Sequence, residues 1–354
     1  MRNAIFLTIA LACLRDSDST PTSSILFVKT YKTGSSTIRS ILNRKAMRES
    51  WSAAVRSSSD ARALSKYRIQ HSNKQVPVPI TKRDPWDLRI ASHRQAISES
   101  TSLSGKRGEA FDLWTGHAMY NEELKRVLKG ENPRVITILR DPVDRFISAW
   151  FYFDRGDLSS LIKFVDRAYS SGVIDSGSDG LGLAASFNSV CRQFSVLSSN
   201  EVFEKIQDDS WIVLVLEHLN EGLLMMKDEL KWDLSDMLYT PKKVNKRKID
   251  DSNKVPESTK RKLRVLNSCD QKLYDIALES HYRRRHRSRQ IQDELKEYES
   301  ILSRLGETCS SDMSLRIQLK KQNVEISCKS LYFDDRDLVL QSALWRELLP
   351  ERSN

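Results

Sequence analysis

The sequence predicts an α/β fold with a mainly parallel central sheet and a helical C-terminal region. Three apolar runs have the length of buried strands, at residues 24–28 (SILFV), 134–139 (RVITIL) and 211–217 (WIVLVLE). Each is followed by apolar residues at helical spacing. Because buried strands that alternate with helices form parallel sheets, these runs predict one sheet covered on both faces.

The composition describes a globular protein that favours anionic partners. The chain has 354 residues, of which 39% are hydrophobic and 29% are charged, as expected for a body with a sizeable core. Lys and Arg number 57 against 47 Asp and Glu, a net charge of +10. That balance suits nucleic acid, an anionic membrane or a phosphorylated small molecule, and charge alone does not choose among them.

Residues 1–20 predict entry to the secretory pathway. One Arg precedes an apolar run from Ala4 to Leu14, which is short for a membrane span of ~20 residues but fits the ~7–15 of a signal peptide. A retained anchor, a cleaved peptide and a buried N-terminal element all stay open. The remainder, 21–354, is predicted to be one domain.

Four cysteines follow this segment, and their spacing matches no zinc site, so no metal is predicted. An even number in an exported chain permits two disulfides. Three pairings are possible, and the sequence does not select one. The four are Cys191, Cys269, Cys309 and Cys328.

The first half of the chain alternates between strand-like and helix-like segments. Apolar periodicity predicts a helix behind Gly34, whereas residues 50–107, rich in Ser, Arg and Gln, predict an irregular insertion of surface loops. FDLWTG (111–116) predicts a strand and NEELKRVLK (121–129) a helix.

A helix is predicted after RVITIL, with Asp141 as its cap and Pro142 at its first position. Its core-facing stripe consists of aromatic residues, namely Phe146, Trp150 and Phe153.

The second half is mostly helical. Residues 158–169 predict a helix, 170–182 a flexible loop, and the segment behind WIVLVLE an amphipathic helix. From Pro256 to Leu305 the pattern stays helical, and the basic run YRRRHRSR (282–289) within it predicts a solvated charged face rather than a nucleic-acid patch.

The stretch KTYKTGSST (29–37) has the features of an anion cradle. A turn between a strand and a helix exposes backbone N–H groups at the positive end of the helix dipole. Gly34 permits a close backbone approach, and Lys29 and Lys32 add positive charge. The GxxxxGK[ST] pattern of nucleotide hydrolases is absent, because Lys32 precedes Gly34, so a kinase or hydrolase is disfavoured.

A second anion contact is predicted at the end of RVITIL. Ligands of open α/β sheets gather beyond the carboxyl ends of the strands, so Arg140 is expected beside the 29–37 turn. Arg140 can make bidentate bonds to a phosphate, and Ser148 can donate from the following helix. The alternative is that Arg140 pairs only with Asp141 or Asp144.

These segments together resemble the galactose-3-O-sulfotransferases, a family of Golgi carbohydrate sulfotransferases that includes galactosylceramide sulfotransferase. KTYKTGSST resembles their 5′-phosphosulfate loop and TILRDPVDRFISAWFYF (137–153) their 3′-phosphate motif. TGHAMY (115–120) and residues 211–239 add to the resemblance. It implies a P-loop-NTPase-like, three-layer sulfotransferase fold in a Golgi membrane protein with a lumenal catalytic domain.

The resemblance implies transfer of a sulfuryl group from 3′-phosphoadenosine 5′-phosphosulfate (PAPS) to the 3-hydroxyl of a β-galactose on a glycolipid or glycan. Adenosine 3′,5′-bisphosphate is then the product. Lys32 is expected at the bridging oxygen and His117 as the base, with Arg140 and Ser148 on the 3′-phosphate. The residues expected to bind the 5′ end are Lys29, Tyr31, Lys32, Thr33, Gly34, Ser35, Ser36 and Thr37.

The chain departs from the family at Tyr31, where the family usually has histidine, because a tyrosine offers no cation there. Two alternatives therefore stand beside the main hypothesis. One is a sulfotransferase for another glycan, such as a glycosaminoglycan. The other is an inactive protein that binds PAPS or an anionic glycan.

Overall fold

The structure is a computed structural model that describes residues 24–49, 51, 53–55, 90–92, 111–116, 120, 123–130, 132–153, 155–172, 186–194, 199–240, 253–287, 291–311, 316–319, 324–328 and 331. The predicted N-terminal segment (1–20), His117, most of the 50–107 insertion and most of the 170–182 loop lie outside these residues. Within the described part, no helix has the length and apolarity needed to cross a membrane.

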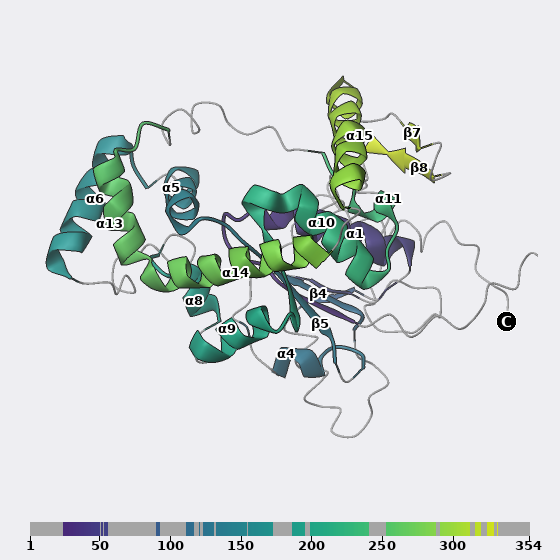
Figure 1. Cartoon of the computed structure of the whole chain (residues 1–354), viewed down its shortest axis with the longest axis horizontal. Coiled ribbons are helices and arrows are strands. Elements are labelled where there is room, and N and C mark those ends of the chain that lie inside the picture. The colour runs from purple at the N-terminus through teal and green to yellow at the C-terminus, as the bar shows by residue number, and fades with distance from the viewer. Residues whose placement is uncertain are drawn as a thin grey trace, which may run out of the picture.

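The centre of the molecule is a six-stranded parallel sheet, which confirms the predicted fold class (Figure 1). Its order is β3-β2-β4-β1-β5-β6, so β1 lies in the interior between β4 and β5. The strands are β1 (Ile25–Val28), β2 (Ala53–Val55), β3 (Ile90–Ser92), β4 (Leu113–Gly116), β5 (Arg134–Leu139) and β6 (Trp211–Val215).

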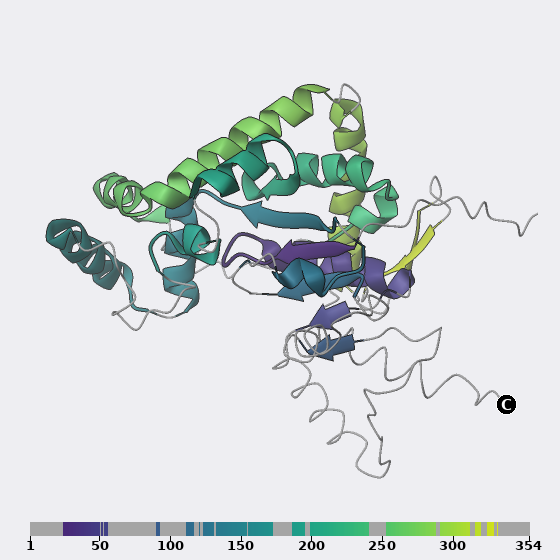
Figure 2. The same ribbon diagram turned by 90° about the horizontal axis from the view of Figure 1, so that it is seen from below.

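Helices cover both faces of this sheet and make three layers, and Figure 1 shows the strands between the two groups of helices. Figure 2 shows the strands lying one beside another across the sheet. One face packs on α1 (Ser35–Arg48), α10 (Leu219–Leu230), α11 (Leu234–Met237) and α15 (Ile291–Ser311). The other packs on α4 (Glu123–Arg126), α8 (Ser189–Gln193), α9 (Ser199–Gln207) and α14 (Ser268–Arg287).

The two-residue alternation of the strands explains this arrangement. Phe27 and Ile136 contribute to the core beneath α1 and α10, whereas Leu26 and Val135 contribute to the core beneath α9 and α14. All four side chains are buried. Successive strand residues point to opposite faces, so strands that are apolar at every position bury both.

A third core joins the helices beside the sheet. It contains α5 (Pro142–Tyr152), α6 (Leu158–Ser171) and α13 (Glu257–Leu266). The side chains of Phe146 and Phe187 stack there with centroids 4.8 Å apart. Beyond α15, the antiparallel strands β7 (Arg316–Leu319) and β8 (Val324–Ser327) form a hairpin.

Two expectations differ from the structure. Residues 50–107 were predicted as surface loops, yet β2 and β3 fall within them and extend the parallel sheet. These strands are only three residues long, too short for a periodicity to show in the sequence.

The basic run of α14 is only in part the solvated face that its composition predicts, since Tyr282, His286 and Arg287 are exposed but Arg284 is buried. Arg284 is only 7% exposed, pairs with Glu229, and donates to the carbonyl of Val213 at 3.4 Å. Arg283 and Arg287 both pair with Asp209, at 3.2 and 3.0 Å. The run therefore connects α14 to β6 and to residues beside it. The number of charges in the sequence does not reveal these contacts.

The helix α5 begins as predicted and is anchored by a buried ion pair. The carboxylate of Asp141 accepts from the N–H groups of Val143 and Asp144 at 2.9 and 3.0 Å, the bonds of an N-cap. Further along α5, the fully buried Arg145 lies with its Nε 3.7 Å from a carboxylate oxygen of Asp270.

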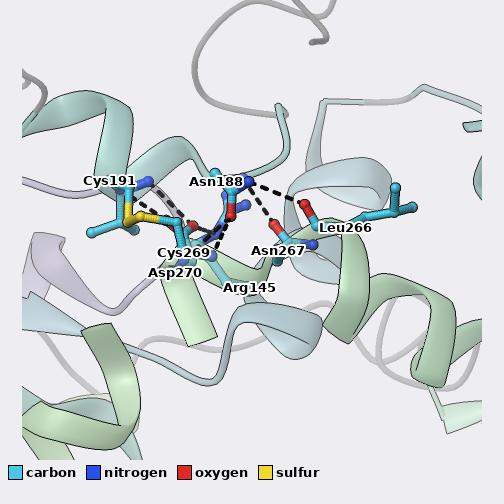
Figure 3. Close-up of a disulfide and its surroundings, with 8 residues drawn as sticks. Arg145, Asn188, Cys191, Leu266, Asn267, Cys269 and Asp270 are labelled. Atoms are coloured by element: carbon cyan, nitrogen blue, oxygen red, sulfur yellow. Dashed lines mark hydrogen bonds and ion pairs between the residues drawn. A yellow bond between two sulfur atoms is a disulfide. The ribbon is translucent and has the colours of Figure 1, made fainter. Parts of the chain in front are cut away.

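Asp270 belongs to the start of α14, beside a disulfide (Figure 3). Its two oxygens accept from the N–H groups of Val190 and Cys191 at 3.2 and 2.8 Å. Burial lowers the pKa of Arg145 and raises the pKa of Asp270, and each charge opposes the shift of the other. Neither charge tolerates loss of its partner in such surroundings.

Two disulfides are formed, Cys191–Cys269 and Cys309–Cys328, which selects one of the three pairings that the sequence left open. The first joins α8 to α14 and closes a loop of 78 residues, and the second joins the end of α15 to the region of β8. Cross-links over such separations stabilise the fold mainly by restricting the unfolded chain.

Replacing an aspartate by asparagine should destabilise the protein more in the buried ion pair than at the surface. Asp270→Asn leaves Arg145 uncompensated and is expected to lower the free energy of unfolding by roughly 3–5 kcal/mol. The matched control is Asp166→Asn, because Asp166 is 49% exposed and pairs with Lys262 at the surface. It should cost at most about 1 kcal/mol. Urea unfolding measures both, and equal losses would contradict the anchoring role of Asp270.

Candidate functional site

The turn between β1 and α1 is held by hydrogen bonds among its own small polar residues. The Thr30 and Thr33 hydroxyls lie 2.7 Å apart, and the Ser35 hydroxyl donates to the carbonyl of Thr30 at 2.7 Å. The Thr30 hydroxyl also donates to the carbonyl of Ile138 on β5. All three hydroxyl side chains are buried. The turn is therefore fastened to the strand that carries Arg140.

The backbone reverses through two residues in the left-handed region. Lys32 has φ 62° and Gly34 has φ 77°. Glycine adopts this conformation without strain, whereas a lysine carries a cost there. A Cβ on Gly34 would lie 2.6 Å from a methyl carbon of Leu216. Position 34 thus requires glycine for two reasons, its left-handed backbone conformation and the closeness of Leu216.

Arg140 and Lys32, predicted from separate motifs, lie together at the carboxyl edge of the sheet. A guanidinium nitrogen of Arg140 donates to the carbonyl of Lys32 at 3.4 Å. The alternative pairing also exists in weak form, since Asp144 lies 3.9 Å from Arg140 and is 55% exposed. Arg140 keeps 26% of its side chain exposed, so it can still face a ligand.

Tyr152 is a member of this site that the sequence reading did not identify. The Lys32 ammonium lies 3.4 Å from the centre of its ring, a cation–π contact worth about 0.5–1 kcal/mol where exposed. Ser148 and Tyr152 are four residues apart on α5 and so share one face of that helix. This spacing places Ser148 on the side of α5 that approaches Lys32. The same spacing was the signal in the sequence by which Tyr152 could have been found.

Glu217 is a second residue that the sequence reading missed. One carboxylate oxygen accepts from the backbone N–H of Asp141 at 3.1 Å, and the other accepts from the hydroxyl of Tyr274 at 3.2 Å. Burial raises the pKa of the Tyr274 hydroxyl, and the Glu217 charge adds to that effect. The carboxylate thereby ties the start of α5 to the end of β6 and to α14.

The remaining predicted residues divide by their exposure. Lys29 is 6% exposed at the end of β1, and its carbonyl accepts from Gln193 at 2.8 Å. The residues with partly exposed side chains are Tyr31, Lys32, Ser36, Thr37, Arg140 and Ser148. Thr33 and Ser35 use their hydroxyls inside the turn, so any contact that they make with a ligand must come from their backbone. His117 lies outside the described residues.

The arrangement can bind an anion with charges at two points. The start of α1 contributes backbone dipoles, Lys32 a point charge and Arg140 a planar guanidinium. A parallel sheet with such a turn at its carboxyl edge defines the class of α/β proteins that bind phosphate-bearing ligands. The order of Lys32 and Gly34 differs from the pattern of nucleotide hydrolases, in which the lysine follows the second glycine.

Comparison with known proteins identifies the family. The profile described as Galactose-3-O-sulfotransferase matches residues 5–159 and 181–328, so the chain belongs to the galactose-3-O-sulfotransferase family. The chain is 24% identical over 275 residues to galactosylceramide sulfotransferase from Bos taurus, covering 72% of this chain. It is 22% identical over 269 residues to galactose-3-O-sulfotransferase 2 from Homo sapiens, also 72%. The match to galactose-3-O-sulfotransferase 3 from Mus musculus is 25% over 297 residues, or 82%.

These relatives are longer than the matched region. The matches cover 56% of the bovine protein, 59% of the human protein and 64% of the mouse protein. The family and the sulfotransferase fold follow from the comparisons together with the α/β structure. The identities of 22–25% show the family but do not fix the acceptor.

A comparison of two glycines with the same φ separates the effect of backbone strain from the effect of the close neighbour at Gly34. Gly34→Ala and Gly130→Ala both place alanine at φ 77°, but nothing lies within 4 Å of a Cβ at Gly130. Gly130→Ala is expected to cost about 1–2 kcal/mol of stability from backbone strain alone. Gly34→Ala should cost more, because Leu216 must also move. Chemical unfolding of both variants tests this, and an equal or smaller loss for Gly34→Ala would contradict it.

Proposed function

We propose that this protein transfers the sulfuryl group of PAPS to the 3-hydroxyl of a β-galactose on a glycolipid or glycoprotein glycan. The observation that carries the proposal is the contact between the Arg140 guanidinium and the Lys32 carbonyl. It joins two motifs about a hundred residues apart into one cationic edge. The family membership supplies the reaction class.

In this proposal the two ends of the donor are held by different elements. The β1–α1 turn binds the 5′-phosphosulfate through Lys32, the hydroxyls of Ser36 and Thr37, and backbone N–H groups. Arg140 and Ser148 bind the 3′-phosphate, which distinguishes PAPS from ATP. Lys29 is buried, so its charge acts from beneath the turn rather than by open contact.

Lys32 is the residue whose interaction with the donor strengthens during the reaction. As the bond from sulfur to the bridging oxygen breaks, negative charge grows on that oxygen, and a nearby ammonium stabilises it. The Tyr152 ring restrains Lys32 in its left-handed turn, which keeps the ammonium at the edge of the site. His117 is proposed as the base that takes the proton of the sugar hydroxyl as it attacks sulfur.

We also propose a location in the Golgi lumen. The two disulfides support an oxidising compartment, and the apolar run from Ala4 to Leu14 supports entry to the secretory pathway. The acceptor in that compartment would be a galactose-terminated glycolipid or glycan.

An inactive binding protein is the second candidate, and one position favours it. Tyr31 lies beside Lys32 where the family usually has histidine, and a phenol cannot supply the missing cation. Such a protein would bind the donor or its product and transfer nothing. A sulfotransferase for another glycan is the remaining alternative within the enzyme class.

One assay separates these readings. Purified protein is incubated with labelled PAPS and a panel of galactosylceramide, lactosylceramide, N-acetyllactosamine and chondroitin. Label is expected on a β-galactoside. His117→Ala should reduce transfer by ~10²-fold or more, the usual contribution of a general base, with binding of adenosine 3′,5′-bisphosphate retained.

Each other outcome selects a different reading. Label on chondroitin alone would favour the glycosaminoglycan enzyme. Binding of the bisphosphate without any transfer would leave the inactive binder, and Tyr31→His would then be the variant that restores transfer. Full activity in His117→Ala would remove that residue from the mechanism.

A further inference from the structure

Three residues that the sulfotransferase proposal does not use form a compact cluster beside β6. Among them, His281 on α14 is fully buried, and its Nε2 lies 3.0 Å from a carboxylate oxygen of Glu221 on α10. His218, just before α10, has its Nδ1 3.7 Å from the same oxygen. One potential ligand atom from each residue falls within 4.8 Å of the others.

We propose that His218, Glu221 and His281 bind a divalent transition-metal ion, with zinc as the favoured metal. Zinc is bound at about 2.0–2.2 Å by imidazole nitrogens and carboxylate oxygens in tetrahedral geometry. Two ligand atoms in such a site are therefore about 3.4 Å apart, and the observed separations of 3.0 and 3.7 Å lie on either side of that value. Two imidazoles favour zinc over magnesium or calcium, which prefer oxygen ligands.

The surroundings orient the ligands as a metal site requires. The Nε2 of His218 is 3.1 Å from the hydroxyl of Tyr282, which leaves Nδ1 directed to the cluster. Partners of this kind fix the tautomer and orientation of a ligating histidine. The second oxygen of Glu221 lies 3.4 Å from the guanidinium of Arg285. That pairing holds the carboxylate in place, and its charge lowers the affinity for a cation.

His281 presents its Nε2 to Glu221 from a fully buried side chain. Its other nitrogen, Nδ1, has no hydrogen-bond partner in the part of the chain that the structure describes. A ligating histidine usually donates its second N–H to an acceptor, so the proposed site rests on the separations of the three ligand atoms and not on this nitrogen. His218 is 28% exposed, so it provides the route by which an ion reaches the cluster and a side on which water completes the coordination.

A metal here would act on the fold rather than on the sulfuryl group. The ligands join the start of α10 to the middle of α14, and Glu217, next to His218, accepts from the N–H of Asp141 at the start of α5. Bound zinc would therefore brace helices that support the donor site. The sequence predicted no metal because its ligands come from segments far apart and include no cysteine.

Metal content and spectroscopy test the site without any transferase assay. Tag-free full-length protein is stripped with chelator, dialysed against micromolar Zn²⁺ and measured by mass spectrometry for zinc. Wild-type protein is expected to retain one equivalent that His218→Ala and Glu221→Gln lose. His286→Ala is the matched control, since His286 is an exposed histidine on the same helix. Zn²⁺ should also raise the melting temperature of wild type and of this control.

Cobalt gives a second readout that does not depend on the stability of a variant. Co²⁺ added to stripped wild-type protein should produce the intense visible absorption of a tetrahedral site, and Zn²⁺ should displace it. Wild-type protein that retains no more zinc than His218→Ala and shows no such absorption would overturn the proposal. Because neither readout involves sulfuryl transfer, its failure is distinct from a failure of the proposed function.

Discussion

The parallel pairing of β1 with β5 is the constraint on which the site depends. Val28 lies opposite Thr137 in the register, and the Thr137 hydroxyl donates to the Val28 carbonyl at 2.9 Å. The pairing continues into the turn, where the hydroxyl of Thr30 reaches the carbonyl of Ile138. Because both strands run in the same direction, whatever follows each one emerges at the same edge. Lys32 and Arg140 meet there for that reason.

The helix α5 depends on a different set of contacts, and these hold the site on that side. Its start is capped by Asp141 and tied to Glu217, and its first turn is held by Arg145 against Asp270. Asp270 is itself fixed by two backbone N–H groups next to the Cys191–Cys269 disulfide. The buried charges and the cross-link thus position the helix that carries Ser148 and Tyr152.

Much of the fold could be predicted from the sequence because its signals are local. The strands β1 and β6 are uninterrupted apolar runs, and β5 is apolar except at Arg134 and Thr137. The capping of α5 by Asp141 follows from residue types at fixed offsets. The short strands β2 and β3 could not be predicted, since three residues carry no period and their place depends on tertiary pairing, of β2 with β4 and of β3 with β2.

The candidate site was predictable only in part for the same reason. Lys32, Gly34 and Arg140 stand within recognisable motifs, and the structure brings Lys32 and Arg140 together. The contacts of Glu217 depend on tertiary placement, so no local pattern predicts them, and for Tyr152 the sequence offered only its four-residue spacing from Ser148. The partners of Arg284 show the converse case, because a run of like charge looks solvated until its distant acidic partners are known.

The central claim is that Arg140 binds the 3′-phosphate of the donor while Lys32 serves the 5′ end. Calorimetric titration of adenosine 3′,5′-bisphosphate and of adenosine 5′-phosphate tests it in wild type, Arg140→Ala, Lys32→Ala and the exposed control Arg261→Ala. Loss of a charged hydrogen bond costs roughly 1.5–3 kcal/mol, or about ten- to a hundredfold in affinity.

Arg140→Ala should weaken binding of the bisphosphate by that factor, leave adenosine 5′-phosphate little changed, and so remove most of the difference between the two ligands. Lys32→Ala should weaken both, and Arg261→Ala neither. An Arg140→Ala variant that still prefers the bisphosphate as strongly as wild type would contradict the account.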